Sequence, residues 1–411
     1  MDHRATILLY LELLFALAIL WREGLLKTRT QQVCAILLVS LAFVFRYSVM
    51  TYETLDYQDW IRVWLSALRE KGAWHGLGEA IWSCNYNVPY LYFLALITKS
   101  EVYELYLVKL VSIFFDVILA WGLMRLVGVF HNSPARRLTA FIGSLWLPTV
   151  FLNGALWGQC DVIYAAFAVW GFYCALDDKP GWSVAAIAVS ISFKLQGIFL
   201  LPAYLAFFIG RKIKWYHFVF FPAVYILTIL PAVFAGRSLT ELLLLYYNNT
   251  GSIGSGLNYN SSSLYALLDF SAMPAESAAK IGVFLAFFFC ASVYVWLFLR
   301  RDEIDSRVLL GAGVLLCLGV PYLLPHMHDR YFFLADVLTF ALAVVSPRMS
   351  LTPALVSFGS LLGYHAYLKM RFLLPMRDGA AAMLLALLLL LAYTVRALNR
   401  PKPDTEPAEI A

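Results

Sequence analysis

The sequence is short of charge. Asp, Glu, Lys and Arg together make up 14% of the 411 residues, whereas hydrophobic residues make up 62%. A soluble domain carries about a quarter charged residues, so this composition excludes a soluble enzyme and predicts a polytopic membrane protein. We expect a single membrane domain at 1–399, followed by a Pro-rich, charged and disordered cytoplasmic tail at 400–411.

Several familiar motifs are also missing. The chain has no Walker motif, dinucleotide-binding fingerprint, zinc-ligand set or Ser-His-Asp order, so nothing predicts the use of ATP. The six cysteines show no ligand-like spacing, which favours roles in helix packing. The formal charge of +5 is no sign of nucleic-acid binding, because the basic residues lie mostly in short loops between apolar segments.

Thirteen apolar segments approach the length of about 20 residues that a membrane span needs. We therefore expect an all-α polytopic fold with about 11–13 transmembrane helices and no cleavable signal peptide. A further segment at 88–98 would invert the later loops if it crossed the membrane. The thirteen segments lie at 5–21, 32–48, 103–129, 139–153, 162–177, 183–194, 197–210, 218–236, 278–299, 308–325, 331–346, 351–369 and 379–398.

The basic residues test this arrangement. With thirteen spans, Lys and Arg fall in alternate loops on one side, which should be the cytoplasm. The opposite loops hold the polar clusters that are not basic, at 51–102, 159–161, 237–276, 326–330 and 370–378, and the amino terminus shares their side. The basic positions are Arg22, Lys27, Arg29, Arg136, Arg137, Lys179, Arg211, Lys212, Lys214, Arg300, Arg301, Arg307, Arg348, Arg396, Arg400 and Lys402.

The segment 51–102 is the longest one that does not resemble a span. Asp56 and Asp59 are three residues apart, so both share a face if the segment forms an amphipathic helix. The indoles of Trp60 and Trp64 would then rest on the membrane surface. A carboxylate at a lipid–water boundary can serve as a general base, because a low dielectric raises its pKa. The alternative is that both acids are ordinary surface residues.

Two further clusters lie on the same side. Gln159 and Asp161, in WGQCD, suit the binding of hydroxyls, a metal or a head group, although Asp161 can instead cap a helix that begins at Val162. Lys194, in FKLQ, interrupts an apolar stretch. It either neutralises a phosphate or extends to the interface as a structural lysine.

The last cluster is PHMHDRYFF at 325–333. Arg330 offers a guanidinium fork for a phosphate or diphosphate, unless Asp329 pairs with it. The spacing of His326 and His328 does not make a helical metal pair. Together the clusters supply acids, amides and cations at a membrane surface. They suit the transfer of a sugar from a polyprenyl phosphate, in which a base activates an acceptor hydroxyl and cations stabilise the departing phosphate.

Five segments occur in one order over residues 50–340. They are DY at Asp56–Tyr57, NYNVPYLYFLAL from Asn85, WGQCDVIY from Trp157, FKLQGIFLLP from Phe193 and HMHDRYFFLADVL from His326. With them the chain resembles the GT-C superfamily of integral-membrane glycosyltransferases, and more closely the bacterial proteins related to GPI mannosyltransferase II. The resemblance implies transfer of mannose, another hexose or a pentose from a polyprenyl phosphate to an extracytoplasmic lipid-linked, glycan or protein acceptor. It also implies a bacterial cytoplasmic membrane.

The resemblance implies roles for individual residues. It places the catalytic loop at about 49–102 and makes Asp56 the general base, with Asp59 as the second catalytic candidate. A second outer loop runs over about 237–276. No cofactor is implied with certainty, and a divalent metal stays open. The substrate-binding candidates are Tyr57, Asn85, Asn87, Trp157, Gln159, Asp161, Lys194, Gln196, Asn258, Asn260, His326, His328 and Arg330, with Lys194 and Arg330 on the lipid phosphate.

The chain departs from these relatives in two ways. Asp329 stands where similar proteins more often have glutamate, and an extra span precedes the catalytic loop.

A transporter or flippase for a lipid-linked sugar is the main alternative. It would use Asp116, Lys194 and Arg330 as a charged path through the membrane, and it predicts an inverted repeat. No repeat is found, and the polar clusters favour one side. Asp116 and Asp336, both inside spans, are either proton-relay acids or buried hydrogen-bonding partners, and we favour the structural role for Asp116.

A glycan polymerase or ligase that uses a lipid diphosphate is the second alternative. Such an enzyme would carry an arginine-rich outer loop late in the chain. The loop at 237–276 has only Arg237 and Lys280 near its ends, which disfavours this class.

Overall fold

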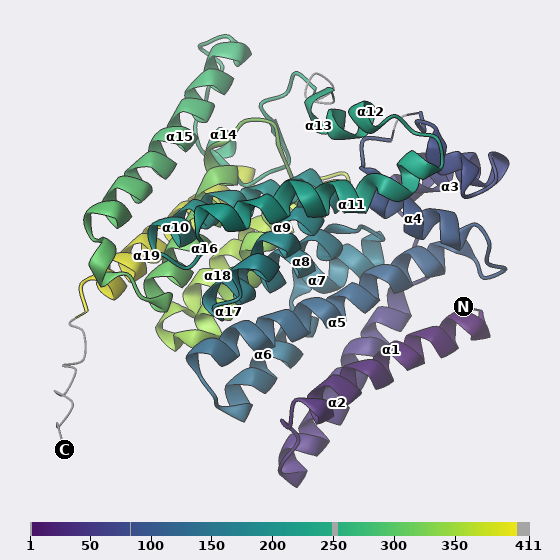
Figure 1. The fold of residues 1–411 in the computed structure, drawn as a ribbon, viewed down its shortest axis with the longest axis horizontal. Helices are drawn as coiled ribbons and strands as arrows, with labels where there is room; N and C mark the ends of the chain where they lie inside the picture. The colour runs from purple at the N-terminus through teal and green to yellow at the C-terminus, as the bar shows by residue number, and fades with distance from the viewer. Residues whose placement is uncertain (1, 83, 249–253, 401–411) are drawn as a thin grey trace.

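The computed structural model describes residues 2–82, 84–248 and 254–400, and its fold is almost entirely helical (Figure 1). The α-helices are α1 (His3–Arg22), α2 (Arg29–Val49), α3 (Arg62–Glu70), α4 (Val88–Ile97), α5 (Glu104–Phe130), α6 (Pro134–Trp146), α7 (Pro148–Phe151), α8 (Asp161–Leu176), α9 (Pro180–Phe193), α10 (Leu201–Ile209), α11 (Phe220–Phe234), α12 (Leu239–Leu243), α13 (Leu245–Asn248), α14 (Leu264–Leu267), α15 (Ala275–Leu299), α16 (Ser306–Leu323), α17 (Phe333–Val345), α18 (Leu351–Leu368) and α19 (Met376–Leu398).

Shorter elements connect these helices. Two are π-helical turns, η1 (Tyr57–Ile61) and η3 (Leu152–Trp157). The 3₁₀ turns within the described residues are η2 (His75–Gly78), η4 (Leu195–Leu200), η5 (Trp215–Val219), η7 (Arg301–Glu303) and η8 (Pro347–Met349). The strands β1 (Asn258–Tyr259) and β2 (Met327–His328) pair in parallel.

Each of the thirteen predicted spans falls on a helix, so the predicted all-α polytopic fold is confirmed. Among the described residues, seven helices are long and apolar enough to cross a membrane, or eight if α6 and the α7–η3 segment, bent by 46°, form one span. Five further apolar helices have 10–17 residues. The predicted number of 11–13 spans therefore requires the shorter helices as well.

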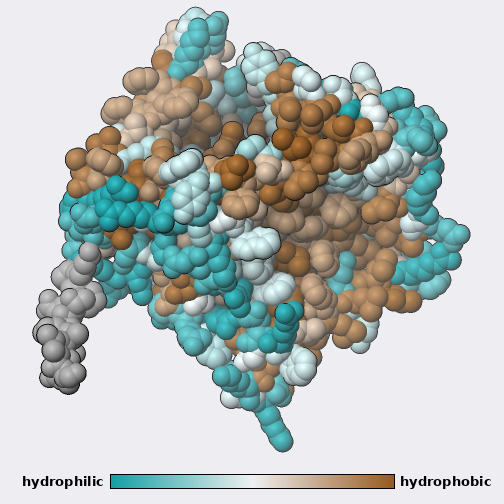
Figure 2. All heavy atoms as spheres, viewed as in Figure 1, coloured by the Kyte–Doolittle hydropathy of each residue, from teal (hydrophilic) through white to brown (hydrophobic). Residues whose placement is uncertain are grey.

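The long helix α5 lies at the centre of the bundle and packs against α1, α6, α8 and α17. The hairpin of α1 and α2 covers one side, and α15 lies at the opposite end of the molecule (Figure 1). Phe284, Phe287 and Phe288 of α15 and Leu227 of α11 are exposed. Figure 2 shows a hydrophobic surface over α11 and beside α5, between hydrophilic areas toward the lower left and at the right edge. Exposed apolar helix faces of this extent indicate contact with lipid.

The predicted basic side is one face of the molecule. Glu23, between α1 and α2, accepts hydrogen bonds from Arg125 at 3.3 Å and from Arg137 near the start of α6. The turns that follow α8, α10 and α15 continue this network through Asp178–Lys212, Arg211–Asp302 and Arg300–Asn399. Because the turn after α1 meets the turn after α5, α2 and α5 run between the same two faces. The short helix α4 therefore adds no crossing, and the later loops are not inverted.

The opposite face carries the segments that form the site. In α3, Trp64, Leu65 and Leu68 are buried while Arg62 and Arg69 are exposed, which is the predicted amphipathic pattern. The pairing of β1 with β2 ties the second outer loop to the segment between α16 and α17. Arg4 donates to Glu101 at 2.7 Å, so the first residues of α1 lie beside the 51–102 segment. Residues 401–411, most of the predicted tail, lie outside the described part of the chain.

Candidate active site

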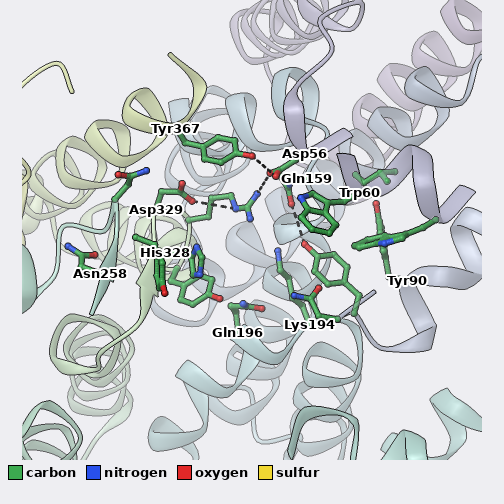
Figure 3. Close-up of a pocket in the computed structure, with 18 residues that line it drawn as sticks. Asp56, Trp60, Tyr90, Gln159, Lys194, Gln196, Asn258, His328, Asp329 and Tyr367 are labelled. Carbon is green, nitrogen blue, oxygen red and sulfur yellow. Dashed lines mark hydrogen bonds and ion pairs between the residues drawn. The ribbon is translucent and has the colours of Figure 1, made fainter. Parts of the chain in front are cut away.

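A polar cavity of about 580 Å³ opens on this face, between the 51–102 segment, the start of α8, the α9–η4 junction and the segment between α16 and α17. Figure 3 shows its lining, with Gln159 and Tyr367 pointing toward Asp56 and with Asp329 on the opposite side from Trp60. The lining residues are Asp56, Trp60, Ile61, Trp64, Asn85, Tyr86, Tyr90, Gln159, Lys194, Gln196, Asn258, Tyr259, Asn260, His328, Asp329, Arg330, Tyr331 and Tyr367.

Two π-helical turns position the centre of the cavity. Asp56 directly precedes η1, and η3 ends at Gly158, whose φ of 77° is the left-handed conformation that favours glycine. This sharp exit from η3 turns Gln159 toward Asp56. Thr54 Oγ1 donates to the carbonyl oxygen of Trp157 at 2.9 Å and so joins the two segments. Single π-helical turns are rare in proteins and are found frequently at functional sites.

The carboxylate of Asp56 accepts four hydrogen bonds. Oδ2 accepts from Trp157 Nε1 at 2.7 Å, from Gln159 Nε2 at 2.7 Å and from Arg330 NH1 at 2.9 Å. Oδ1 accepts from the Tyr367 hydroxyl at 2.5 Å. A carboxylate offers about four lone-pair sites, so these donors occupy most of its capacity. Asp56 therefore joins four separate segments of the chain.

Arg330 lies among three carboxylates. Besides its bond to Asp56, its Nε is 3.7 Å from Asp161 Oδ2 and 3.7 Å from Asp329 Oδ1. The guanidinium also covers the indole of Trp157, at 4.8 Å from the ring centroid. Its charge is shared among three acids. The predicted pair with Asp329 is therefore secondary to the hydrogen bond with Asp56, and the predicted binding of a phosphate stays a prediction.

Lys194 is the second cation of the site. Its Nζ donates to Asp161 Oδ1 at 2.5 Å and lies 5.0 Å from the ring centroid of Tyr86. Asn153 donates to the other oxygen of Asp161 at 2.9 Å. Lys194 is 4% exposed, so it does not extend to the membrane surface. Asp161 begins α8, but its carboxylate binds Lys194 and Asn153, and no side-chain cap is formed there.

Two titratable groups beside Arg330 have shifted pKa values. Burial raises the pKa of Asp329 to about 7, helped by the negative charges of Asp56 and Asp161 and opposed by Arg330. Burial lowers the pKa of His328 to about 4, so its ring is neutral at physiological pH. That ring stacks on Tyr259, with centroids 4.6 Å apart. A stacked neutral pair of this kind suits contact with a sugar ring more than binding of an anion.

The structure brings most of the predicted site residues together. Trp157 and Asp161 lie directly behind the cavity wall, and His326 lines an adjoining cavity. The predicted residues that line the main cavity are Asp56, Asn85, Gln159, Lys194, Gln196, Asn258, Asn260, His328 and Arg330.

Three predicted residues lie elsewhere. Asp59 is exposed and outside the cavity lining, because the wider π-helical turn η1 removes it from the face that Asp56 occupies. Tyr57 is fully buried under Arg62, whose guanidinium lies 5.2 Å from its ring centroid. Asn87 caps α4 by accepting from the Val88 amide, and its amide group donates to Tyr225 at 2.9 Å.

Sequence reasoning missed several residues of the wall. Trp60 and Trp64 line the cavity and do not simply rest on the membrane surface, and Trp64 is only 4% exposed. Tyr367, near the end of α18, had no motif around it, although it donates to Asp56. Asp329 was considered only as a partner of Arg330. Its place directly between two predicted ligands, His328 and Arg330, was a usable signal.

Lys109 of α5 stabilises the backbone segment that leads to Asp56. Its fully buried Nζ donates to the carbonyl oxygens of Val49 at 3.1 Å and Tyr52 at 2.7 Å. One turn further along α5, Ser112 Oγ donates to the carbonyl oxygen of Gln159 at 2.7 Å. One helix thus fixes both chain segments that meet at Asp56.

We expect Lys109→Met to displace the segment before Asp56. The substitution keeps the apolar stem but leaves two part-buried carbonyls without the donor that they share, a loss of about 1.5–3 kcal/mol. Thermal unfolding should begin at a lower temperature, and the rate of transfer should fall. Lys99→Met, at an exposed position on the same face, is the matched control. An unchanged unfolding temperature in Lys109→Met would show that the two carbonyls do not depend on Lys109.

A metal site is not preformed in the described residues. No group of three or more His, Cys, Asp or Glu side chains among them is arranged to hold an ion. The three acids of the site surround Arg330 and Lys194 instead.

The fold and the cavity define a multi-pass membrane protein whose acids and cations meet at one face. Residues 86–325, more than half of the chain, match the family model described as glycosyltransferase family 87. The chain therefore belongs to glycosyltransferase family 87, a GT-C-type family of membrane glycosyltransferases. The predicted resemblance to the GT-C superfamily is confirmed. A search of curated proteins gives no significant match. The matched range includes Gln159 and Lys194 but neither Asp56 nor Arg330, so the roles of those two depend on geometry.

Proposed function

We propose that this glycosyltransferase transfers a sugar from a polyprenyl phosphate to an extracytoplasmic acceptor, in a bacterial cytoplasmic membrane. The sugar is mannose, another hexose or a pentose, and the acceptor is lipid-linked, a glycan or a protein. The observation that carries the proposal is the meeting of Asp56, Asp161, Lys194 and Arg330 around one cavity on the face opposite the basic loops. The positive-inside tendency of membrane proteins makes that face extracytoplasmic.

A second cavity supports a lipid-linked donor. It has a volume of about 460 Å³ and shares Tyr86 and Lys194 with the main cavity. Ile198, in its wall, is 42% exposed on the outside of the bundle. Its other apolar lining residues include Leu195, Phe199, Pro325 and Met327. A lipid chain along this cavity would place its phosphate near Lys194, where the two cavities meet.

The proposed reaction needs no cofactor to balance. A carboxylate takes the proton of the acceptor hydroxyl, and the hydroxyl oxygen forms a bond to the anomeric carbon. The bond between that carbon and the phosphate oxygen breaks, and its electron pair leaves with the polyprenyl phosphate. Lys194 stabilises the charge that develops on this phosphate. Asp56, the predicted general base, lies at the centre of the cavity and has about one lone pair of Oδ1 left for the proton.

The transporter alternative has less support. Its charged path required Asp116 to face the route of the substrate. Asp116 instead accepts from Arg46 of α2 at 2.9 Å, and both side chains are fully buried between helices. Within the described residues Asp116 is therefore paired between helices, and it does not line the cavity that holds Lys194 and Arg330.

The donor class can be tested with purified protein and a panel of sugar donors. We expect consumption of a polyprenyl-phosphate sugar and no consumption of the corresponding nucleotide sugar. In Lys194→Ala the KM for the lipid donor should rise about 10–100-fold, the value of one charge-assisted hydrogen bond. Lys212→Ala, on the opposite face beside Asp178, is the matched control. Consumption of a nucleotide sugar would overturn the proposed donor, and an unchanged KM in Lys194→Ala would move the phosphate away from Lys194.

A further inference from the structure

The helix α18 brings two tyrosines to the site, and both lie outside the range that matches the family model. Tyr364 and Tyr367 are three residues apart, so they share one face of the helix. Both rings contact the indole of Trp157. Tyr367 stacks on it, with centroids 4.8 Å apart and 18° between the ring planes, and Tyr364 meets it edge-on at 5.2 Å. One helix late in the chain therefore reaches the centre of the site.

The two hydroxyl groups have different partners. The hydroxyl of Tyr367 donates to Asp56 Oδ1 at 2.5 Å. The hydroxyl of Tyr364 accepts from Asn153 Nδ2 at 3.3 Å, and the same amide group donates to Asp161 at 2.9 Å. The contact of Tyr364 with an acid is therefore indirect, whereas that of Tyr367 is direct (Figure 3).

The two oxygens of Asp56 differ in how fully they are occupied. Oδ2 accepts from Trp157, Gln159 and Arg330. A carboxylate oxygen has two lone pairs, so three donors leave Oδ2 no room for a proton. Within the described part of the chain, Oδ1 accepts one hydrogen bond, from Tyr367. Its second lone pair is therefore the position at which Asp56 can take a proton.

We propose that Tyr367 is a positioning residue that fixes Oδ1 of Asp56 as the proton-accepting atom of the reaction. This inference rests on the proposed function. In the step, the acceptor O–H bond breaks and its proton passes to the free lone pair of Oδ1, while the acceptor oxygen bonds to the anomeric carbon. The polyprenyl phosphate leaves with the electron pair of the broken C–O bond. Oδ1 then releases the proton to water.

Two stacked rings hold the two oxygens of Asp56. Trp157 Nε1 donates to Oδ2 and the hydroxyl of Tyr367 donates to Oδ1, while the rings themselves lie face to face. Trp157 is fully buried and gives Tyr367 a fixed surface to stack on. Rotation of the carboxylate would break both hydrogen bonds at once. The free lone pair of Oδ1 is therefore held in one direction, which is the preorganisation that proton transfer from a bound hydroxyl requires.

The consumption of the polyprenyl-phosphate donor measures the effect of Tyr367→Phe. The substitution removes one hydroxyl and keeps the ring that stacks on Trp157. We expect kcat to fall about 10- to 100-fold, the value of a hydrogen bond to a charged group, while the KM for the donor stays unchanged. Tyr204→Phe is the matched control, because it removes a buried hydroxyl that donates to the carbonyl oxygen of Ser183 at 2.9 Å, away from the cavity lining. The control should lose stability but keep its kcat.

Replacement of Tyr367 by 3-fluorotyrosine gives a readout that a merely structural role would not move. The ring and the hydroxyl stay in place, but the fluorine makes the hydroxyl a stronger donor. A stronger hydrogen bond to Oδ1 stabilises the ionised carboxylate and makes it a weaker base. We therefore expect a lower kcat, with the donor KM and the unfolding temperature unchanged.

The outcomes separate this inference from the proposed function. Wild-type protein that consumes no lipid donor would contradict the proposed function. An active wild type with an equally active Tyr367→Phe would overturn the role of Tyr367 alone. So would an equal fall of kcat in Tyr204→Phe, or a rise in donor KM that accounts for the whole loss in Tyr367→Phe. If Tyr367→Phe does not fold, the fluorotyrosine protein decides: a lower kcat supports the inference, and an unchanged kcat overturns it.

Discussion

Asp56→Asn is expected to abolish sugar transfer and to lower the stability of the fold. Asparagine has the shape of aspartate but lacks its charge, and Arg330 would lose the carboxylate to which its guanidinium is hydrogen-bonded. Removing one partner of a buried ion pair typically costs about 3–5 kcal/mol. An amide nitrogen at the position of Oδ2 would also face three donors, those of Trp157, Gln159 and Arg330.

The measurement pairs a transfer assay with thermal unfolding in the same detergent. Asp59→Asn is the matched control, because it makes the same chemical change three residues later at an exposed position. We expect the control to keep wild-type activity and unfolding temperature. The reverse ranking, with Asp59→Asn inactive and Asp56→Asn active, would move the essential carboxylate to Asp59 and remove Asp56 from the centre of the site.

The helices could be predicted from the sequence because long apolar runs have few alternatives in a membrane. Every backbone polar group at membrane depth must be satisfied within its own segment, so such a run becomes a helix. The basic loops fixed which ends share a face, and the contact of Glu23 with Arg125 and Arg137 agrees with that assignment. The same logic predicted correctly that Gln159, Lys194 and Arg330 would meet, since each lies at the same end of its segment.

The finer geometry could not be predicted, for physical reasons that differ from residue to residue. The prediction that Asp59 shares a face with Asp56 assumed α-helical spacing, but the segment begins with a π-helical turn. No sequence pattern indicated that turn. Tyr367 lies at the end of an apolar helix, where tyrosine is common because it suits the membrane–water interface. Its hydrogen bond to Asp56, 311 positions away, therefore could not be predicted from the neighbouring sequence. Lys109 was not considered in the sequence analysis, and only the fold shows the carbonyls to which it donates.

The different surroundings of Asp56 and Asp329 are a property of the assembled site. Whether a carboxylate keeps free lone pairs depends on donors from other segments, and Asp56 and Asp329 differ in that respect and not in residue type. Sequence reasoning ranked Asp56 first because of its place in the first outer loop, and the hydrogen bonds that distinguish it from Asp329 are visible only in the fold.

Arg330→Ala is expected to reduce kcat/KM by about 10- to 100-fold, since a lost charge-assisted hydrogen bond contributes about 1.5–3 kcal/mol and, among the described residues, Arg330 has one such bond, to Asp56. Arg330→Lys should recover only part of this loss. A lysine keeps the charge but lacks the planar fork that bonds Asp56 and covers the indole of Trp157.

The pH profile gives Arg330→Ala a second, directional readout. Arg330 opposes the raised pKa of Asp329, so its removal should raise that pKa further above about 7. If ionised Asp329 is the active form, the wild-type rate should rise with pH through about 7. This rise should move to more alkaline values in Arg330→Ala and less so in Arg330→Lys. Arg211→Ala, an exposed arginine beside Asp302 on the opposite face, should leave the profile unchanged. A rise that stays in place in Arg330→Ala would mean that the titrating group lies outside the influence of Arg330, and hence that Asp329 does not control the rate.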